Sequence, residues 1–162
     1  MKRIVSFFLC IVLVFSLFST NASATDGEEL APYVVDFVVT TDADALPDSE
    51  NNSRVTGLIF SYSLGLLSSG NTLEISGLTQ CSFDVVKCGF KNLTVERRKT
   101  SSDSWEDYYE FGNVYREATA AGLSTSLLVA SGYQYRVTCK HYAKKNILSV
   151  QTISNTSNIV TV

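Results

Sequence analysis

The chain has 162 residues, 45% of them hydrophobic, with 13 basic and 16 acidic side chains and one histidine. The acidic balance, with no basic stripe interleaved with aromatic residues, argues against nucleic-acid binding. A chain of this length fits one domain behind a targeting segment.

The N-terminus has the three parts of a secretory signal peptide. Lys2 and Arg3 form a basic start, residues 4–18 are apolar apart from two serines, and Ala22-Ser23-Ala24 matches a small-residue cleavage site. The apolar run is shorter than the ~20 residues of a comfortable membrane-spanning helix. We therefore expect residues 1–24 to be removed, no transmembrane span to remain, and the protein to be secreted or associated with the cell envelope.

Charge divides the remaining chain into two parts. Eight acidic residues and no basic ones lie between Asp26 and Glu50, whereas residues 54–162 are mildly basic. We interpret residues 25–53 as an acidic arm, most simply a solvated leader, and alternatively a segment that docks on the basic body or on a partner. Within the arm, residues 33–40 are rich in β-branched and aromatic side chains and predict an edge strand.

Residues 54–162 read as short strands joined by Gly, Ser and Asn turns. Turn signals recur every ~8–12 residues, and no segment shows sustained helical periodicity. In the most informative stretch, residues 131–143, Tyr135, Val137 and Cys139 alternate with polar residues, which predicts a central strand. The whole pattern predicts one all-β domain, an antiparallel β-sandwich of seven to nine short strands.

The order of these signals resembles a fibronectin type III or immunoglobulin-like sandwich. Residues 93–98 and the following Trp105 are similar to that family's C strand, turn and next strand, residues 129–139 to its F strand, and residues 158–162 to its G strand. The resemblance implies that Tyr135 forms a tyrosine corner, in which the hydroxyl bonds to upstream backbone. The fold it implies does not by itself give a function.

Two departures from that family are visible. No tryptophan stands in residues 72–80, where fibronectin domains often have one, and Val137 occupies the place of the antibody-like Tyr two residues before the second Cys. The chain as a whole, including GFKNLTVERR and GYQYRVTCKHYA, also resembles short exported proteins of unknown function from Gram-positive bacteria. That likeness supports the expected compartment and implies no chemistry.

Three cysteines remain after removal of the leader, which is an odd number. At least one thiol is then free or bridges to another chain. One disulfide, from Cys139 to Cys88 or to Cys81, and three buried free thiols are equally good interpretations. No CxxC pair and no Cys–His spacing typical of zinc is present, and we expect no metal or other cofactor.

Candidate catalytic groups are few. His141 shares a parity with Cys139, so a thiolate–imidazole pair is conceivable, but a histidine at a solvent-exposed strand end is the simpler interpretation. Paired carboxylates near aromatic rings occur in glycosidase clefts. The acids around Trp105 that raise this alternative, against a plain solvated strand face, are Asp103, Glu106, Asp107 and Glu110. Residues 42–50 are acidic but lack the EF-hand calcium pattern.

Aromatic side chains are the strongest remaining lead. Five of them are the candidates for an exposed binding patch, although burial in the core is the commoner fate of such residues: Trp105, Tyr108, Tyr109, Tyr115 and Tyr142. The alternative is that most of them fill the core. On the strand at residues 131–143, the outward residues Arg136 and Lys140 would lie beside Tyr142.

The favoured function is a non-enzymatic exported module for binding, adhesion or envelope association. Its partner would be a cell-wall or host glycan, or another protein, because exposed aromatic rings with flanking polar groups suit both. The alternatives are a small secreted hydrolase and a secreted effector or bacteriocin-like factor whose acidic arm makes the contact.

Overall fold

The computed structural model describes residues 31–40, 53–54 and 57–162. The predicted signal peptide and the acidic loop at residues 42–50 lie outside these residues. The strands in the described part of the chain are β1 (Tyr33–Thr40), β2 (Ser53–Arg54), β3 (Ile59–Ser69), β4 (Thr72–Cys81), β5 (Lys87–Arg98), β6 (Glu106–Arg116), β7 (Ala120–Leu128), β8 (Gln134–Asn146), β9 (Ser149–Thr156) and β10 (Val160–Thr161).

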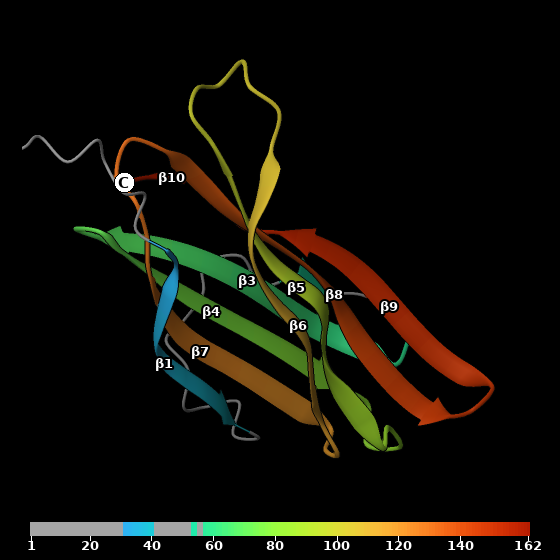
Figure 1. The fold of residues 1–162 in the computed structure, drawn as a ribbon. Coiled ribbons are helices and arrows are strands. Elements are labelled where there is room, and N and C mark those ends of the chain that lie inside the picture. Colours follow the sequence, from blue (N-terminus) through green and yellow to red (C-terminus); the bar gives the residue numbers. More distant parts are fainter. Residues whose placement is uncertain (1–30, 41–52, 55–56) are drawn as a thin grey trace, which may run out of the picture.

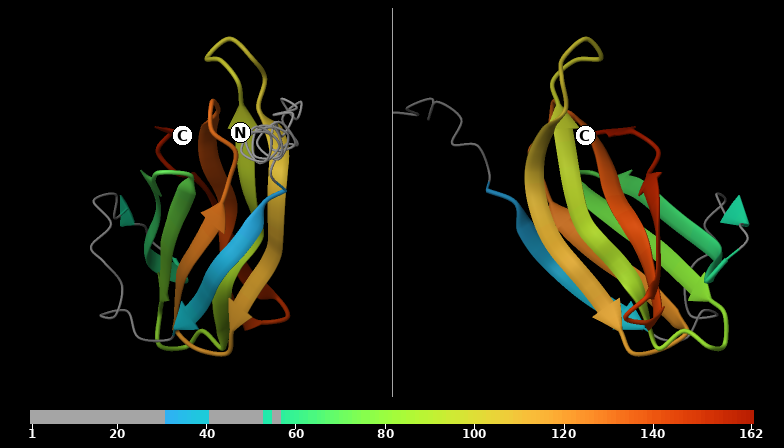
Figure 2. Two further views of the ribbon diagram at one scale, coloured as in Figure 1. Left: turned by 60° about the vertical axis from the view of Figure 1, so that its left-hand side comes forward. Right: turned by 90° about the vertical axis from the view of Figure 1, so that its right-hand side faces the viewer.

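The strands form two antiparallel sheets that pack face to face (Figure 1, Figure 2). Sheet A has the order β1-β7-β4-β3-β2, and sheet B has the order β10-β8-β5-β6. Strand β9 pairs with β8 as well, next to β10. This arrangement confirms the predicted all-β sandwich.

The core lies between the two sheets because their central strands turn alternate side chains inward. The main cluster joins both sheets through its buried members, among them Leu64, Leu73, Phe90, Leu123 and Val137. A smaller cluster of buried residues fills one end: Ile59, Cys81, Val85, Cys88, Ala121 and Ala143.

Strand β8 is the centre of sheet B. It pairs with β5 on one side and with β9 and β10 on the other. The side chains of Tyr135, Val137 and Cys139 are buried, as the period-two pattern predicts. The hydroxyl of Tyr135 donates a hydrogen bond to the carbonyl of Ala130 at 2.7 Å, so the expected bond to upstream backbone is present. Burial raises the pKa of this phenol.

Strand β1 forms an edge of sheet A. It comes before β3 in the chain, but β7 and β4 lie between the two strands in the sheet. It pairs antiparallel with β7, and its Val34 and Val39 pack against the main cluster. The ring of Phe37 stacks on Phe111 of sheet B with centroids 5.5 Å apart, and Arg116 donates to the carbonyl of Val39 at 2.8 Å. The strand within the arm is thus docked on the sandwich by backbone pairing and by contacts to both sheets.

Candidate ligand-binding face

The outer face of sheet B carries a continuous row of polar and aromatic side chains. In β8, buried inward residues alternate with Gln134, Arg136, Thr138, Lys140 and Tyr142, which point away from the core. The register sets these residues opposite outward residues of β5 on one side and of β9 on the other. The middle of sheet B therefore exposes these polar and aromatic side chains to solvent on its outer face.

One end of this face is organised around Trp105, which precedes β6. The guanidinium carbon of Arg98 lies 4.4 Å from the indole centroid, and that of Arg136 lies 4.3 Å from it. Both arginines are anchored, Arg98 to Gln134 at 2.9 Å and Arg136 by an ion pair with Glu96. Cation–π contacts of this geometry hold the half-buried indole in place on the sheet surface.

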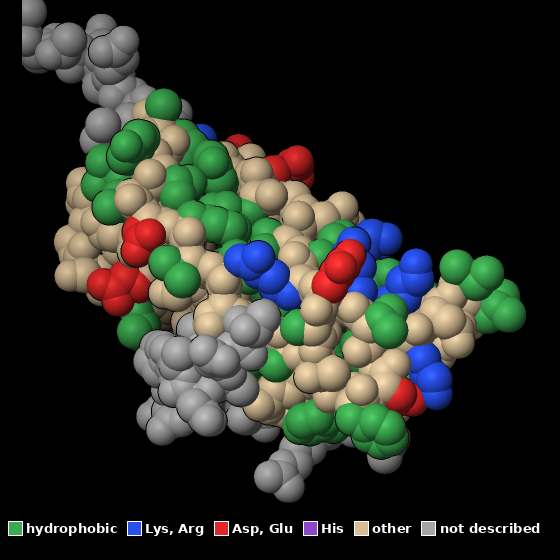
Figure 3. Space-filling model, turned by 90° about the horizontal axis from the view of Figure 1, so that it is seen from below, with side chains coloured by type: hydrophobic (Ala, Val, Ile, Leu, Met, Phe, Trp, Pro, Cys, Tyr) green, Lys and Arg blue, Asp and Glu red, His purple; other side chains and the backbone are tan. Residues whose placement is uncertain are grey.

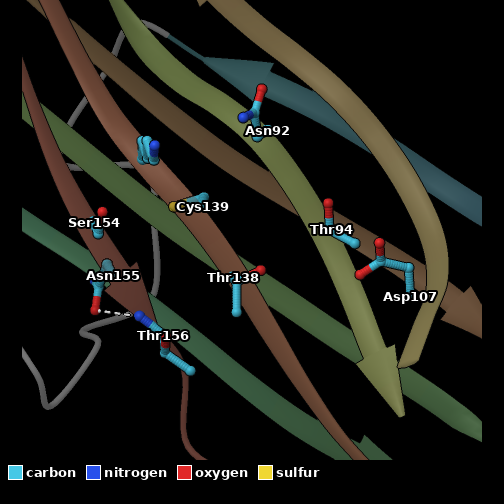
Figure 4. Close-up of a pocket in the computed structure, with 9 residues that line it drawn as sticks. Asn92, Thr94, Asp107, Thr138, Cys139, Ser154, Asn155 and Thr156 are labelled. Carbon is cyan, nitrogen blue, oxygen red and sulfur yellow. Dashed lines mark hydrogen bonds between the residues drawn. The ribbon is translucent and has the colours of Figure 1, made fainter. Parts of the chain in front are cut away.

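A shallow depression of about 240 Å³ follows directly along the face (Figure 4). Thr94 and Thr138 are cross-strand partners on β5 and β8, and Asp107 lies beside them on β6. The full lining is Asn92, Thr94, Asp107, Thr138, Cys139, Lys140, Ser154, Asn155 and Thr156. Hydroxyl, amide, carboxylate and ammonium groups thus converge where they can donate and accept hydrogen bonds.

The depression arises from an irregularity in β5. The register with β8 shifts between Lys91 and Thr94, and Asn92 adopts a left-handed φ of 51°. The backbone N–H of Asn92 donates a hydrogen bond to the side-chain oxygen of Asn113 at 3.0 Å. A bulge of this kind bends its strand and re-aims side chains, which here leaves a hollow between β5 and β9.

The far end of the face is formed by Tyr115 and Tyr142, whose ring centroids are 4.8 Å apart. Both are register partners of Gly89, which lies between them on β5. A Cβ at Gly89 would lie 2.1 Å from the carbonyl oxygen of Val114, and its φ is +146°, so only glycine fits there. Burial, with a contribution from the neighbouring Tyr142, raises the pKa of Tyr115.

The five predicted patch residues therefore do not form one patch. Trp105, Tyr115 and Tyr142 lie on the outer face, at its two ends. Tyr108 and Tyr109 pack against the main core cluster instead. Tyr108 makes an edge-on contact with Tyr135 at 5.5 Å, and Arg97 lies over its ring.

His141 is a core residue and not a histidine at an exposed strand end. It is fully buried, and its ring contacts those of Tyr62 and Phe90, with centroids 4.8 Å and 5.3 Å away. Desolvation lowers its pKa to about 3. Cys139 Sγ lies 3.8 Å from its Nε2, as the shared parity predicts, but burial raises the pKa of that thiol to about 12.

The hydrogen bonds of His141 fix one neutral tautomer. The hydroxyl of Thr79 donates to the carbonyl of Gly89 at 3.2 Å, so His141 Nδ1–H donates to Thr79 Oγ1 at 2.7 Å. Nε2 then accepts from the amide of Asn155 at 3.2 Å. With both groups neutral and out of reach of solvent, a thiolate–imidazole pair is not available to a substrate.

Cys81, Cys88 and Cys139, the cysteines in the described part of the chain, are free thiols. Cys88 pairs in register with Ala143, four residues along β8 from Cys139, a separation of about 13 Å at the rise of a strand. A disulfide needs α-carbons within about 7 Å, so this register does not support a Cys88–Cys139 bridge. Cys81 and Cys88 instead share the smaller cluster and a thiol–thiol hydrogen bond, which raises the pKa of Cys81 and lowers that of Cys88.

The acids near Trp105 do not form a paired catalytic site. Asp103 accepts from the backbone and hydroxyl of Thr100, at 2.7 Å and 2.8 Å, and so closes a turn. Glu106 is paired with Arg97 at 2.6 Å. Of the four acids, Asp107 alone lines the depression. Across the residues that the structure describes, no cluster of three or more His, Cys, Asp or Glu is placed to hold a metal ion.

Comparison with known proteins finds no matching family model, no matching curated protein and no matching solved structure. In the part of the chain that the structure describes, no helix could span a membrane. Function therefore has to be inferred from the chemistry of the chain's own surface.

Proposed function

We propose that the chain is an exported, non-enzymatic module that binds an extended glycan along the outer face of sheet B. The observation that carries this proposal is Trp105, whose ring is contacted by Arg98 and Arg136 next to a polar depression. An immobilised aromatic ring can stack on a sugar ring at little entropic cost. The side chains of Thr94, Thr138 and Lys140 would then bond the hydroxyls of the adjoining sugar units.

Three further observations support this role. The signal-like N-terminus favours export to a compartment where cell-wall or host glycans occur. The sandwich, together with the Tyr135–Ala130 bond, supports the resemblance to fibronectin type III or immunoglobulin-like modules. The burial of His141 removes the base that a thiolate–imidazole hydrolase requires.

A glycan array probed with the chain that begins at Thr25 tests the proposal. We expect binding to one class of polysaccharide, and a loss of about tenfold in affinity by titration calorimetry for Trp105→Ala, because a stacking contact is removed. Trp105→Phe should retain part of the affinity. Tyr33→Ala is the matched control, because this tyrosine is 68% exposed but lies on the edge strand of sheet A.

Equal affinities of Trp105→Ala and the unchanged chain would refute the outer face as the site. An array without any bound glycan, or turnover of a bound one, would refute the function itself. Circular dichroism of each variant shows whether the fold is intact.

A further inference from the structure

Two turns at one end of the sandwich expose bulky apolar side chains. In the β8–β9 hairpin the two turn residues are Ile147 and Leu148, which are 85% and 93% exposed. In the connection from β4 to β5, Phe83 lies in a tight turn and is 95% exposed. Such turns ordinarily carry Gly, Asn, Asp or Ser, which suit the backbone geometry and water. Neither core cluster contains these three apolar residues, here called the apolar tips.

The two turns are held next to each other. The backbone N–H of Val86 donates to the carbonyl of Lys144 at 2.9 Å, and Lys145 bridges to Asp84 at 2.5 Å. The β8–β9 turn forms the lower right corner of the molecule in Figure 1. Seen from below, apolar side chains project at the margin of the surface, with charged groups between the projections (Figure 3). The apolar tips therefore belong to one end of the molecule.

Lysines stand directly behind the apolar tips. Lys87 and Lys144 are cross-strand partners of β5 and β8, and so are Lys91 and Lys140 farther along the same strands. Like charges directly opposite each other destabilise an antiparallel pair. Asp84, an acidic residue at this end of the molecule, already forms an ion pair with Lys145. Lys87 also lies over the Tyr115 ring, 5.0 Å from its centroid, and an anionic partner would relieve the repulsion that remains between the lysines.

We propose that this end docks on a membrane surface that contains anionic lipids. The apolar tips would enter the boundary between headgroups and acyl chains, and Lys87 and Lys144 would contact lipid phosphates. Exposed apolar side chains with basic side chains behind them are the combination that interfacial lipid binding requires. A soluble anionic polymer would satisfy the lysines but leave Phe83, Ile147 and Leu148 in water, so lipid accounts for both observations.

Vesicle co-sedimentation tests this with the chain that begins at Thr25, which keeps every described residue. We expect binding to vesicles of phosphatidylcholine with one-third phosphatidylglycerol, and much weaker binding to pure phosphatidylcholine. The binding should weaken with added salt, because charge attraction at a surface is screened over ~10 Å at 0.1 M.

Two variants separate the contributions. Ile147→Asn with Leu148→Gly installs a favoured hairpin turn, so the fold should be retained while vesicle affinity falls by about tenfold or more. Lys87→Gln with Lys144→Gln should also weaken binding and make it less dependent on salt. Leu67→Asn is the matched control, because Leu67 is exposed near the β3–β4 turn. It should bind like the unchanged chain.

Equal binding to charged and neutral vesicles, or none to either, would overturn the proposal. So would a turn variant that binds as well as the unchanged chain while the lysine variant does not, since that pattern identifies a site for soluble polyanions. Glycan binding through Trp105 is measured without vesicles, so each proposal can fail on its own.

Discussion

Both ring nitrogens of His141 are hydrogen-bonded inside the core, one to Thr79 and the other to Asn155. The burial of this imidazole makes the stability of the protein depend on pH. Its pKa is lowered to about 3 by burial, whereas an unfolded histidine titrates near 6.5. Between these values the unfolded chain takes up a proton that the folded chain does not. Stability from this group is therefore complete above pH 6.5 and is lost as the pH falls toward 3.

We expect the free energy of unfolding to decline below pH 6.5 with a slope of up to about 1.4 kcal/mol per pH unit from this residue. Urea titrations at several pH values measure the slope, and His141→Gln should make it shallower between pH 6.5 and 4.5. The chain has one histidine, so its NMR signals are unambiguous. An imidazole that titrates near pH 6.5 in the folded protein would contradict the expectation.

Cys81 and Cys88 are the thiols that contact each other. We expect a disulfide oxidant to join them, each thiol losing one proton and one electron, and to leave Cys139 reduced. Peptide mapping by mass spectrometry identifies the bridge. Cys139→Ser is the control and should not alter the pattern. A bridge that includes Cys139, or a dimer joined by a disulfide, would be inconsistent with the structure.

At the scale of elements, β1 completes sheet A. Without it the outer edge of β7 would present unpaired backbone groups, and Val34 and Val39 would leave the core. We expect a chain that begins at Ser53 to lose stability on the order of 2–4 kcal/mol, from the lost apolar burial. It should also self-associate, because an open edge strand pairs with other chains.

Thermal melting and light scattering measure these effects of β1 removal. A chain that begins at Ala31 keeps the strand and lacks only the start of the arm, so it should behave like the longer chain. If the chain from Ser53 melts at the same temperature and stays monomeric, β1 is dispensable.

The predictability of elements from sequence depends on how regular they are. The period of two in β8 predicted its central place and the inward parity of Tyr135, Val137 and Cys139. In β6 the register shifts near its partners Val95 and Glu96, and Tyr108 and Tyr109 both pack toward the core. A strict alternation cannot predict two consecutive inward residues, so the sequence does not separate Tyr108 and Tyr109 from the aromatic side chains of the outer face.

Long-range relations were beyond the sequence pattern as well. Nothing local indicates that β1 pairs with β7, because the choice of an open edge depends on the assembled sheet. Asn158 lies in the segment expected to form the last strand, but its side-chain amide accepts from the N–H of Leu66 at 3.1 Å and donates to the carbonyl of Leu66 at 2.7 Å. This side chain ties the end of sheet B to β3 of sheet A.

At the scale of the whole molecule, Trp105 and the lysines behind the apolar tips lie at opposite ends of sheet B. Arg98, which contacts Trp105, pairs with Gln134, and Lys87 pairs with Lys144, so these two ends are separated by ten residues of β8, or about 33 Å of strand. A module docked on lipid by its turns would hold Trp105 away from the membrane. The composition and charge of the chain did not predict this separation of the two ends, because the separation depends on which turns the fold brings to the same end.

The position of Trp105 also has a spectroscopic consequence. It is the only tryptophan in the chain, and two guanidinium groups contact its ring at the surface. Its emission is therefore a single-site signal that needs no added label. A ligand that displaces an arginine or stacks on the indole would change the emission, whereas lipid at the apolar tips would leave it unaltered. One fluorescence spectrum can thus report which of the two surfaces is occupied.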